Sequence, residues 1–165
     1  MRKSIKIGLG IVLGVVGLGV GVVATYSPAQ RPAPSVTVEP TPEVLARGQY
    51  LAEHVTGCTT CHASRDFSRY AGPVAGVPGE GGDSYGEEVG MPGVVCLPNI
   101  TPHAEAGIGS WTDGEIVRAM REGVDRDGEA LFGMMPYEYY RSLSDDDALA
   151  IVAYLRTLTP SSTRP

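Results

Sequence analysis

The chain has 165 residues, a length that allows one domain with short appendages. Both lysines, Lys3 and Lys6, stand beside Arg2 at the N-terminus, and the remaining residues set 10 arginines against 19 acidic residues, a net charge of −9. This acidic body argues against nucleic-acid binding, which needs a basic face, and it favours a basic, apolar or permanently associated protein partner.

The N-terminal stretch, residues 1–26, is expected to be a membrane anchor or a secretory signal. Residues 7–24 carry no charge and consist almost wholly of Gly, Val, Leu and Ile. A signal usually has an apolar region of about 7–15 residues, whereas a transmembrane helix needs about 20, so the length favours an anchor. Val22 and Ala24 form a weak small-residue cleavage site, which leaves the signal open. In both cases the basic residues stay on the cytoplasmic side and the rest of the chain is exported to the periplasmic side.

A proline-rich linker is expected over residues 27–42. It contains five prolines and little that could be buried. Such a segment is a semi-rigid, extended tether, and it would keep the next domain near partners in the membrane. The compact domain is expected over residues 43–160, followed by a tail at 161–165.

The first helix of this domain is expected over residues 42–55. Thr41 is a suitable N-cap, and Pro42 fits the first helical position. Gly48 stands in mid-helix, where glycine costs about 1 kcal/mol relative to alanine. We expect close approach by another helix to compensate for this cost.

Two further helices are indicated nearer the C-terminus. The run from Thr112 to Glu115 matches the capping box Ser/Thr-x-x-Glu, and it opens a short helix that ends at Gly123. Ser144 or Asp145 opens the last helix, whose apolar residues recur at helical spacing before Pro160. Three main helices therefore make up the domain.

The motif that carries the chemistry is Cys58-Thr59-Thr60-Cys61-His62. Two thiols at positions i and i+3 can reach the two vinyl groups on one edge of a haem, and the histidine that follows then lies under the iron. A Cys-x-x-Cys-His run is typical of covalent c-type haem attachment. The motif therefore predicts haem c, with Cys58, Cys61 and His62 as its binding residues.

Other readings of two cysteines at this spacing are a thioredoxin-like redox pair, half of a zinc site and a simple disulfide. A zinc site would need a second cluster of ligands, but only Cys96, His54 and His103 remain, and they form no second pair. A thioredoxin-like pair would stand in an α/β pattern, which this chain lacks. Three cysteines also leave one thiol over after haem attachment, so no disulfide framework is implied.

An electron-transfer haem normally has a second axial ligand, and several residues could supply it. Met120 lies on the apolar side of a predicted helix and is expected in the core, whereas Met91 falls in the glycine-rich, irregular stretch 64–98. Met134 and Met135 stand before Pro136, which pushes Met135 into an extended conformation from which its thioether can point sideways at a flat cofactor. We favour Met135 over Met134. The candidates considered are Met91, Met120, Met134, Met135, His54 and His103.

Taken together, these residues resemble a class I c-type cytochrome over residues 43–159. The chain is similar to single haem modules in the cytochrome c subunits of membrane-bound alcohol and gluconate dehydrogenases. The resemblance is carried by Arg47-Gly48-Gln49-Tyr50-Leu51-Ala52, Cys58-Thr59-Thr60-Cys61-His62, Gly72-Pro73, Asn99-Ile100-Thr101-Pro102, Gly107-Ile108-Gly109-Ser110-Trp111-Thr112-Asp113, Met134-Met135-Pro136-Tyr137 and Ile151-Val152-Ala153-Tyr154-Leu155.

The resemblance implies an all-α fold, the small cytochrome c fold, with three helices around the haem and the first and last crossing near Gly48 and Tyr154. It implies that the Pro73 carbonyl accepts a hydrogen bond from His62 Nδ1, which fixes the ring and leaves Nε2 for iron. It further implies Met135 as sixth ligand and Trp111 near the haem propionates, although Trp111 could equally be an ordinary core aromatic.

The chain departs from these relatives in three respects. The dehydrogenase subunits carry several haem modules, whereas this chain has one. The doubled methionine keeps Met134 possible as the ligand. Cys96 has no role in the family pattern, and its apolar neighbours indicate a buried small hydrophobe or, alternatively, an intermolecular disulfide.

Three functions fit these observations. The first is a membrane-tethered electron carrier with His/Met ligation, which favours outer-sphere electron transfer. The second is the electron-transfer subunit of a dehydrogenase complex, whose partners include the dehydrogenase, a quinol–cytochrome oxidoreductase or a terminal oxidase. The third is a haem enzyme or gas sensor with an open sixth position. In the first two cases the chain is not itself an enzyme.

Overall fold

A computed structural model describes residues 2–25 and 30–164, with the side chains of residues 2–5 left aside. The chain divides into two compact units, Met1–Arg31 and Pro32–Pro165, which we describe separately. The ends of the predicted N-terminal segment, residues 1 and 26, residues 27–29 of the predicted linker and residue 165 of the tail lie outside the described residues.

The first unit contains one helix, α1 (Arg2–Thr25). Its portion Lys6–Thr25 is 20 residues long with a mean hydropathy of 2.5. Length and composition therefore suffice to cross a membrane, and a signal sequence near an N-terminus would have the same properties.

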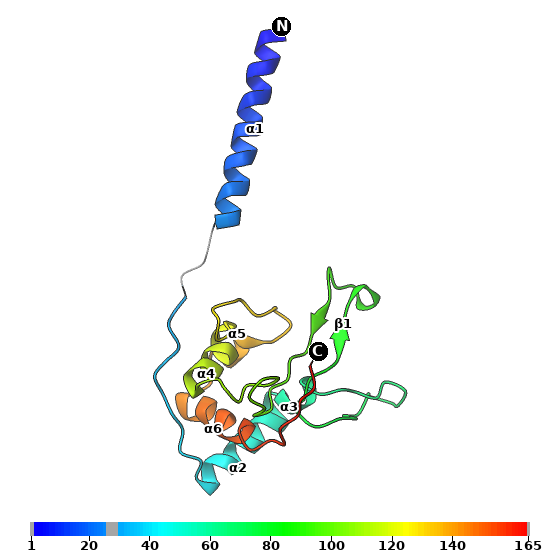
Figure 1. The fold of residues 1–165 in the computed structure, drawn as a ribbon, viewed down its shortest axis with the longest axis vertical. Coiled ribbons are helices and arrows are strands. Elements are labelled where there is room, and N and C mark those ends of the chain that lie inside the picture. Colours follow the sequence, from blue (N-terminus) through cyan, green and yellow to red (C-terminus); the bar gives the residue numbers. More distant parts are fainter. Residues whose placement is uncertain (1, 26–29, 165) are drawn as a thin grey trace. The chain divides into compact units, whose positions relative to one another are not determined.

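Among its described residues, the second unit combines short helices and one short hairpin with long irregular segments (Figure 1). Strands β1 (Ser84–Tyr85) and β2 (Val95–Cys96) pair antiparallel, with a short 3₁₀ turn, η2 (Glu87–Val89), between them. The expectation of a helical chain is confirmed, but the all-α detail is not, because this hairpin forms inside the stretch expected to be irregular. The helical elements are α2 (Pro42–Tyr50), the π-helical turn η1 (Leu51–Val55), α3 (Cys58–Cys61), α4 (Asp113–Glu122), α5 (Tyr137–Tyr140) and α6 (Asp145–Leu155).

The predicted helix starts are confirmed by their caps. The Thr41 hydroxyl accepts a hydrogen bond from the Val44 amide at 3.3 Å, and the Ser144 hydroxyl accepts one from the Asp147 amide at 3.2 Å. At α4 both halves of the capping box form between Thr112 and Glu115. These side chains satisfy amide groups that the first turn of a helix leaves without an intrahelical partner.

The first predicted helix changes its winding at Leu51. The amide and the hydroxyl of Thr56 both donate to the Leu51 carbonyl, at 2.8 and 3.0 Å. A bond that spans five residues widens the turn from α to π geometry. Thr56 and the left-handed Gly57 then connect the widened turn to α3.

The hydrophobic core lies where α2 and α6 cross, with α4 beside them. Gly48 makes the crossing close, because a Cβ at this position would overlap the Ala150 carbonyl and would lie 2.9 Å from the Tyr154 Cβ. The expected compensation for a mid-helix glycine is therefore present. The buried core residues are Leu51, Ala52, Ile108, Ile116, Val117, Met120, Ala148, Ile151, Val152 and Leu155.

The expected tether is partly wrong, because its second half belongs to the folded domain. The Val38 amide donates to the Asp113 carboxylate at 3.0 Å, and the Val38 side chain packs against the core. A Cβ on Gly114 would overlap the Pro34 carbonyl. One apolar side chain and one amide aimed at the start of α4 are enough to dock this extended segment, so the domain begins at Pro32 rather than at residue 43.

We expect Gly48→Ala to destabilise the domain. Overpacking at a tight contact costs about 1–3 kcal/mol, which exceeds the gain in helix propensity of about 1 kcal/mol when the Ala150 backbone cannot retreat. Urea unfolding followed by circular dichroism measures the difference. Gly93→Ala is the matched control, since no atom lies within 4 Å of the place its added methyl group would take; equal stabilities of the two variants would contradict the close crossing.

Candidate functional site

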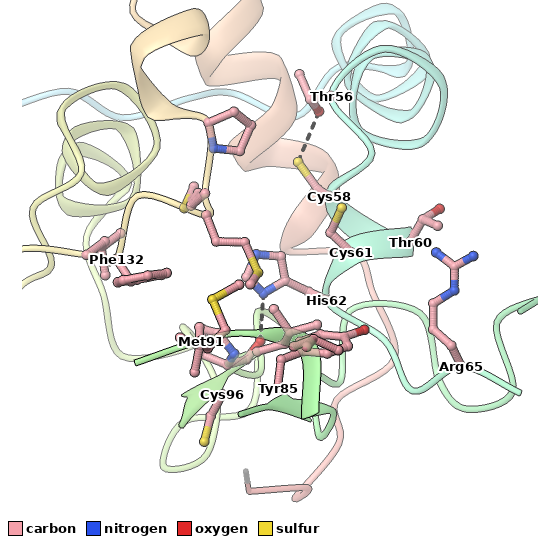
Figure 2. A pocket seen from close by; sticks show the side chains of 18 of the residues that line it. Thr56, Cys58, Thr60, Cys61, His62, Arg65, Tyr85, Met91, Cys96 and Phe132 are labelled. Carbon is pink, nitrogen blue, oxygen red and sulfur yellow. Dashed lines mark hydrogen bonds between the residues drawn. The ribbon is translucent and has the colours of Figure 1, made fainter. Parts of the chain in front are cut away.

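A cavity of about 550 Å³ opens beside α3 and is lined mainly by apolar side chains (Figure 2). Its walls come from three regions of the sequence: residues 56–65, the hairpin region 85–98 and the segment 131–140. The two cysteines of the motif, His62 and three methionines all line it. A concave, apolar space with a few convergent polar or sulfur groups is typical of a cofactor site.

The short helix α3 presents the two thiols. Gly57 precedes it in a left-handed conformation, and the His62 amide donates to the Cys58 carbonyl at 2.9 Å, which closes the turn. Both Cys58 and Cys61 line the cavity, and all three cysteines of the chain are free.

The environment of Cys58 is not that of a catalytic redox thiol. Burial raises the pKa of the Cys58 thiol, and the Thr56 hydroxyl, 3.0 Å from its sulfur, opposes this only in part. Redox-active Cys-x-x-Cys pairs instead lower the pKa of a thiol. Within the described part of the chain, no group of three or more His, Cys, Asp and Glu residues could hold a metal ion.

The ring of His62 is held by the carbonyl of Pro98. Its Nδ1 lies 2.8 Å from Pro98 O, and because a carbonyl only accepts, Nδ1 carries the proton and Nε2 keeps its lone pair. Burial lowers the pKa of His62, and the bond to Pro98 offsets this in part. The ring is therefore neutral and oriented, as an iron ligand requires.

The prediction that Pro73 fills this role is wrong. The Pro73 carbonyl accepts from the Asp66 amide at 2.9 Å, next to an antiparallel bridge between Arg65 and Val74. This local pairing occupies the Pro73 carbonyl and closes residues 65–74 into a loop of their own. The Pro98 carbonyl reaches His62 instead, because the hairpin carries the chain back toward α3.

Of the residues considered as a second axial ligand, only methionines line the cavity. Met91, Met134 and Met135 line the cavity, and neither His54 nor His103 does. Met120 is buried in the core, as expected. Met135 is half-buried and packs against the core, whereas Met134 is more exposed; the choice of Met135 stays a prediction.

Two expectations remain for this region, one for Trp111 and one for Cys96. Trp111 packs against the hydrophobic core and does not line the cavity, which agrees with an ordinary core aromatic. Cys96 is exposed at the cavity rim, where the Ser84 hydroxyl donates to its sulfur at 3.2 Å, so the expectation of a buried thiol is wrong. Successive side chains of a strand face opposite sides, and Figure 2 shows the Cys96 sulfur turned away from His62.

Tyr140 is a site residue that the sequence did not reveal. Its hydroxyl donates to the Thr56 carbonyl at 2.7 Å, which joins α5 to the residues before Cys58 across the cavity. Burial raises the pKa of Tyr140 to about 12, so the hydroxyl remains a donor at all physiological pH values. The tyrosine-rich run directly after Met135-Pro136 was the one sequence feature that could have pointed to Tyr140. A contact between residues 84 positions apart leaves no pattern in the sequence.

The donor set fits a haem c. Two thiols lie on one side of a short turn, a neutral imidazole follows them, and thioether sulfurs stand on the segment that forms another wall of the same apolar cavity. His and Met are the axial ligands of electron-transfer cytochromes.

Comparison with known proteins agrees with this chemistry. The model of the family described as cytochrome c matches residues 45–159. The chain is 33% identical over 96% of its length to a nicotinate dehydrogenase subunit of Pseudomonas putida. It is 34% identical over 67% of its length to the cytochrome c subunit of a quinone-dependent alcohol dehydrogenase of Gluconobacter oxydans.

A similar match, 33% identical over 67% of the chain, is the cytochrome c subunit of gluconate 2-dehydrogenase of Pantoea cypripedii. The chain spans 13%, 20% and 22% of the length of these three relatives, in the order given. The predicted similarity to alcohol and gluconate dehydrogenase subunits is therefore confirmed.

We expect Tyr140→Phe to lower the free energy of unfolding by about 1 kcal/mol, the usual net value of one hydrogen bond, because the Thr56 carbonyl loses its donor. Thermal or urea unfolding of the purified protein measures this. Tyr139→Phe is the control, since Tyr139 is 79% exposed. A Tyr140→Phe variant as stable as this control would show that the bond across the cavity contributes nothing.

Proposed function

Since the chain belongs to the cytochrome c family, we propose that it is a membrane-tethered, mono-haem electron-transfer protein. Cys58 and Cys61 would hold one haem c through thioether bonds, and His62 and Met135 would be its axial ligands. The observation that carries the proposal is the convergence of these four side chains on one apolar cavity. Bound haem c supplies reversible one-electron chemistry between Fe(II) and Fe(III).

The chain's own residues would orient the cofactor and exclude water. Pro98 holds His62 with Nε2 available, and the hydrogen bond raises the basicity of the ring. A thioether ligand from Met135 would stabilise the reduced state and raise the potential. Ligation by both His62 and Met135 would leave no site for oxygen or peroxide, so we place electron transfer ahead of a haem enzyme or gas sensor.

Partners are proposed from the relatives and from the charge. The similar proteins are subunits of dehydrogenases, which makes a dehydrogenase the first candidate donor, with a quinol–cytochrome oxidoreductase or terminal oxidase as the other class of partner. Because the body is acidic and has no lysine, it favours a basic or permanently bound partner over an acidic partner that docks on surface lysines. The proposed location is the periplasmic side of the cytoplasmic membrane.

The ferric absorption spectrum tests the ligand set. We expect the wild-type protein to show the weak long-wavelength charge-transfer band of a sulfur–iron bond, and we expect Met135→Ala to abolish it. Met134→Ala and Met91→Ala are the matched controls, because both residues line the same cavity and both variants should retain the band.

Loss of the band in Met134→Ala or Met91→Ala, with Met135→Ala unchanged, would reassign the ligand within the same function. A wild-type protein without the band, whose reduced form takes up carbon monoxide readily, would contradict the electron-carrier proposal and support an open sixth position.

Membrane tethering is tested by fractionation of the expressing cells. We expect the full chain in the membrane fraction, resistant to high salt, because the apolar helix Lys6–Thr25 stays attached. A chain in which a foreign, cleavable signal replaces residues 1–25 should become soluble in the periplasm with an unchanged spectrum. Recovery of the full chain as a soluble protein lacking its N-terminus would show a cleaved signal instead of an anchor.

A further inference from the structure

Residues 161–163, which follow α6, contact the loop that carries Pro98. Asn99, which is only 3% exposed, uses one end of its side chain for this contact and the other end for its own loop. Its Nδ2 donates to the carbonyls of Ser161 and Thr163, at 2.7 and 3.0 Å. Its Oδ1 accepts from the Thr101 amide and hydroxyl, at 2.8 and 2.7 Å. The residue directly after Pro98 is therefore fixed between its own loop and the C-terminal segment.

Glu80 makes a second attachment to the same segment. One carboxylate oxygen accepts from the hydroxyls of Ser161 and Thr163, at 2.9 and 3.0 Å, while the other accepts from the Val77 amide at 2.8 Å. Desolvation alone would raise the pKa of Glu80, but these hydrogen bonds together lower it, so the carboxylate stays charged and keeps accepting. Residues 161–163 thus join two loops that are separate in the sequence.

The two loops meet directly behind His62. The Gly81 amide donates to the His62 carbonyl at 3.0 Å. Gly81 has φ +68°, and a Cβ there would lie 2.6 Å from the Pro98 carbonyl carbon and 2.8 Å from the Asn99 nitrogen. The peptide that follows Pro98 is therefore packed between Gly81 on one side and the contacts of Asn99 on the other. Figure 1 shows the end of the chain running toward α3 and the hairpin.

We propose that residues 161–163 are a C-terminal strap that sets the position of the Pro98 carbonyl on His62 Nδ1, with Asn99 and Glu80 as positioning residues. The inference rests on the proposed function, because the consequence is a tuned haem potential. A strong bond to Nδ1–H raises the basicity of the imidazole and favours ferric iron. Loosening the strap should lengthen the bond and favour the ferrous state.

Two variants of the full, haem-loaded chain test the strap without changing its charge. Asn99→Leu removes all side-chain bonds of Asn99 and adds no charge near the iron. The double variant Ser161→Ala/Thr163→Val removes both hydroxyls that reach Glu80. Ser161 and Thr163 are only half-buried, so this variant still tests the strap if Asn99→Leu, a change at a buried residue, fails to fold. Glu80→Gln is avoided, since removing a negative charge would itself favour the ferrous state.

Ser162→Ala is the matched control, because Ser162 stands in the same segment, is exposed and carries no charge. The measurements are the midpoint potential and the NMR signal of the His62 Nδ1 proton in the reduced protein. We expect Asn99→Leu to raise the ferrous-to-ferric ratio at fixed ambient potential about threefold, or about 28 mV at 59 mV per tenfold change. The double variant should change it in the same direction by less, and Ser162→Ala should leave it unchanged.

An unchanged potential and an unchanged Nδ1 signal in the folded variants, with only a lower melting temperature, would overturn the proposal and leave the strap a purely stabilising contact. A wild-type chain that binds no haem would refute the proposed function itself, and this result is recognised before any variant is compared.

Discussion

The close crossing of α2 and α6 at Gly48 is the contact on which the rest of the domain depends. It brings two helices separated by about a hundred residues into backbone contact, and the core residues Leu51, Ile151 and Val152 are buried around it. The π-turn follows α2 directly, and only Thr56 and Gly57 separate it from α3, so the crossing also helps to place Cys58 and Cys61. A small domain has little apolar surface to bury, and a glycine at the crossing increases what each helix can cover.

Polar contacts around this core orient the helices more than they stabilise them. Arg47 and Asp147 pair at 2.8 Å across the crossing, which lowers the pKa of Asp147, yet the Arg47 side chain is 52% exposed, and pairs of this kind contribute little. Asp113 is better placed. It is shielded from solvent, accepts from the Val38 amide and pairs with Arg156 at 2.7 Å. One carboxylate thereby joins the extended entry segment, the start of α4 and the end of α6.

The cofactor site combines a local part with a distant part. The thiols and the backbone of His62 come from one turn of five consecutive residues. The group that orients His62 comes from Pro98, beyond the hairpin, and the wall facing the thiols comes from Met135 and Tyr140. An electron-transfer site needs little reorganisation on oxidation, and rigid attachment of these distant segments provides it. In our proposal the C-terminal strap contributes to this rigidity.

The sequence by itself determined the elements that depend on neighbouring residues. Caps, the attachment motif, the apolar N-terminal helix and the core role of Met120 all follow from short-range spacing, because backbone hydrogen bonding and helical periodicity act over a few residues. The tertiary structure decided which carbonyl meets His62, where Cys96 faces, that Pro34 and Val38 dock on α4, and that Tyr140 reaches Thr56. Pro73 and Pro98 are both prolines in irregular, glycine-containing loops, and only the pairing of each loop with its neighbours determines which carbonyl remains available. Such choices depend on contacts between residues tens of positions apart, for which composition and spacing carry no signal.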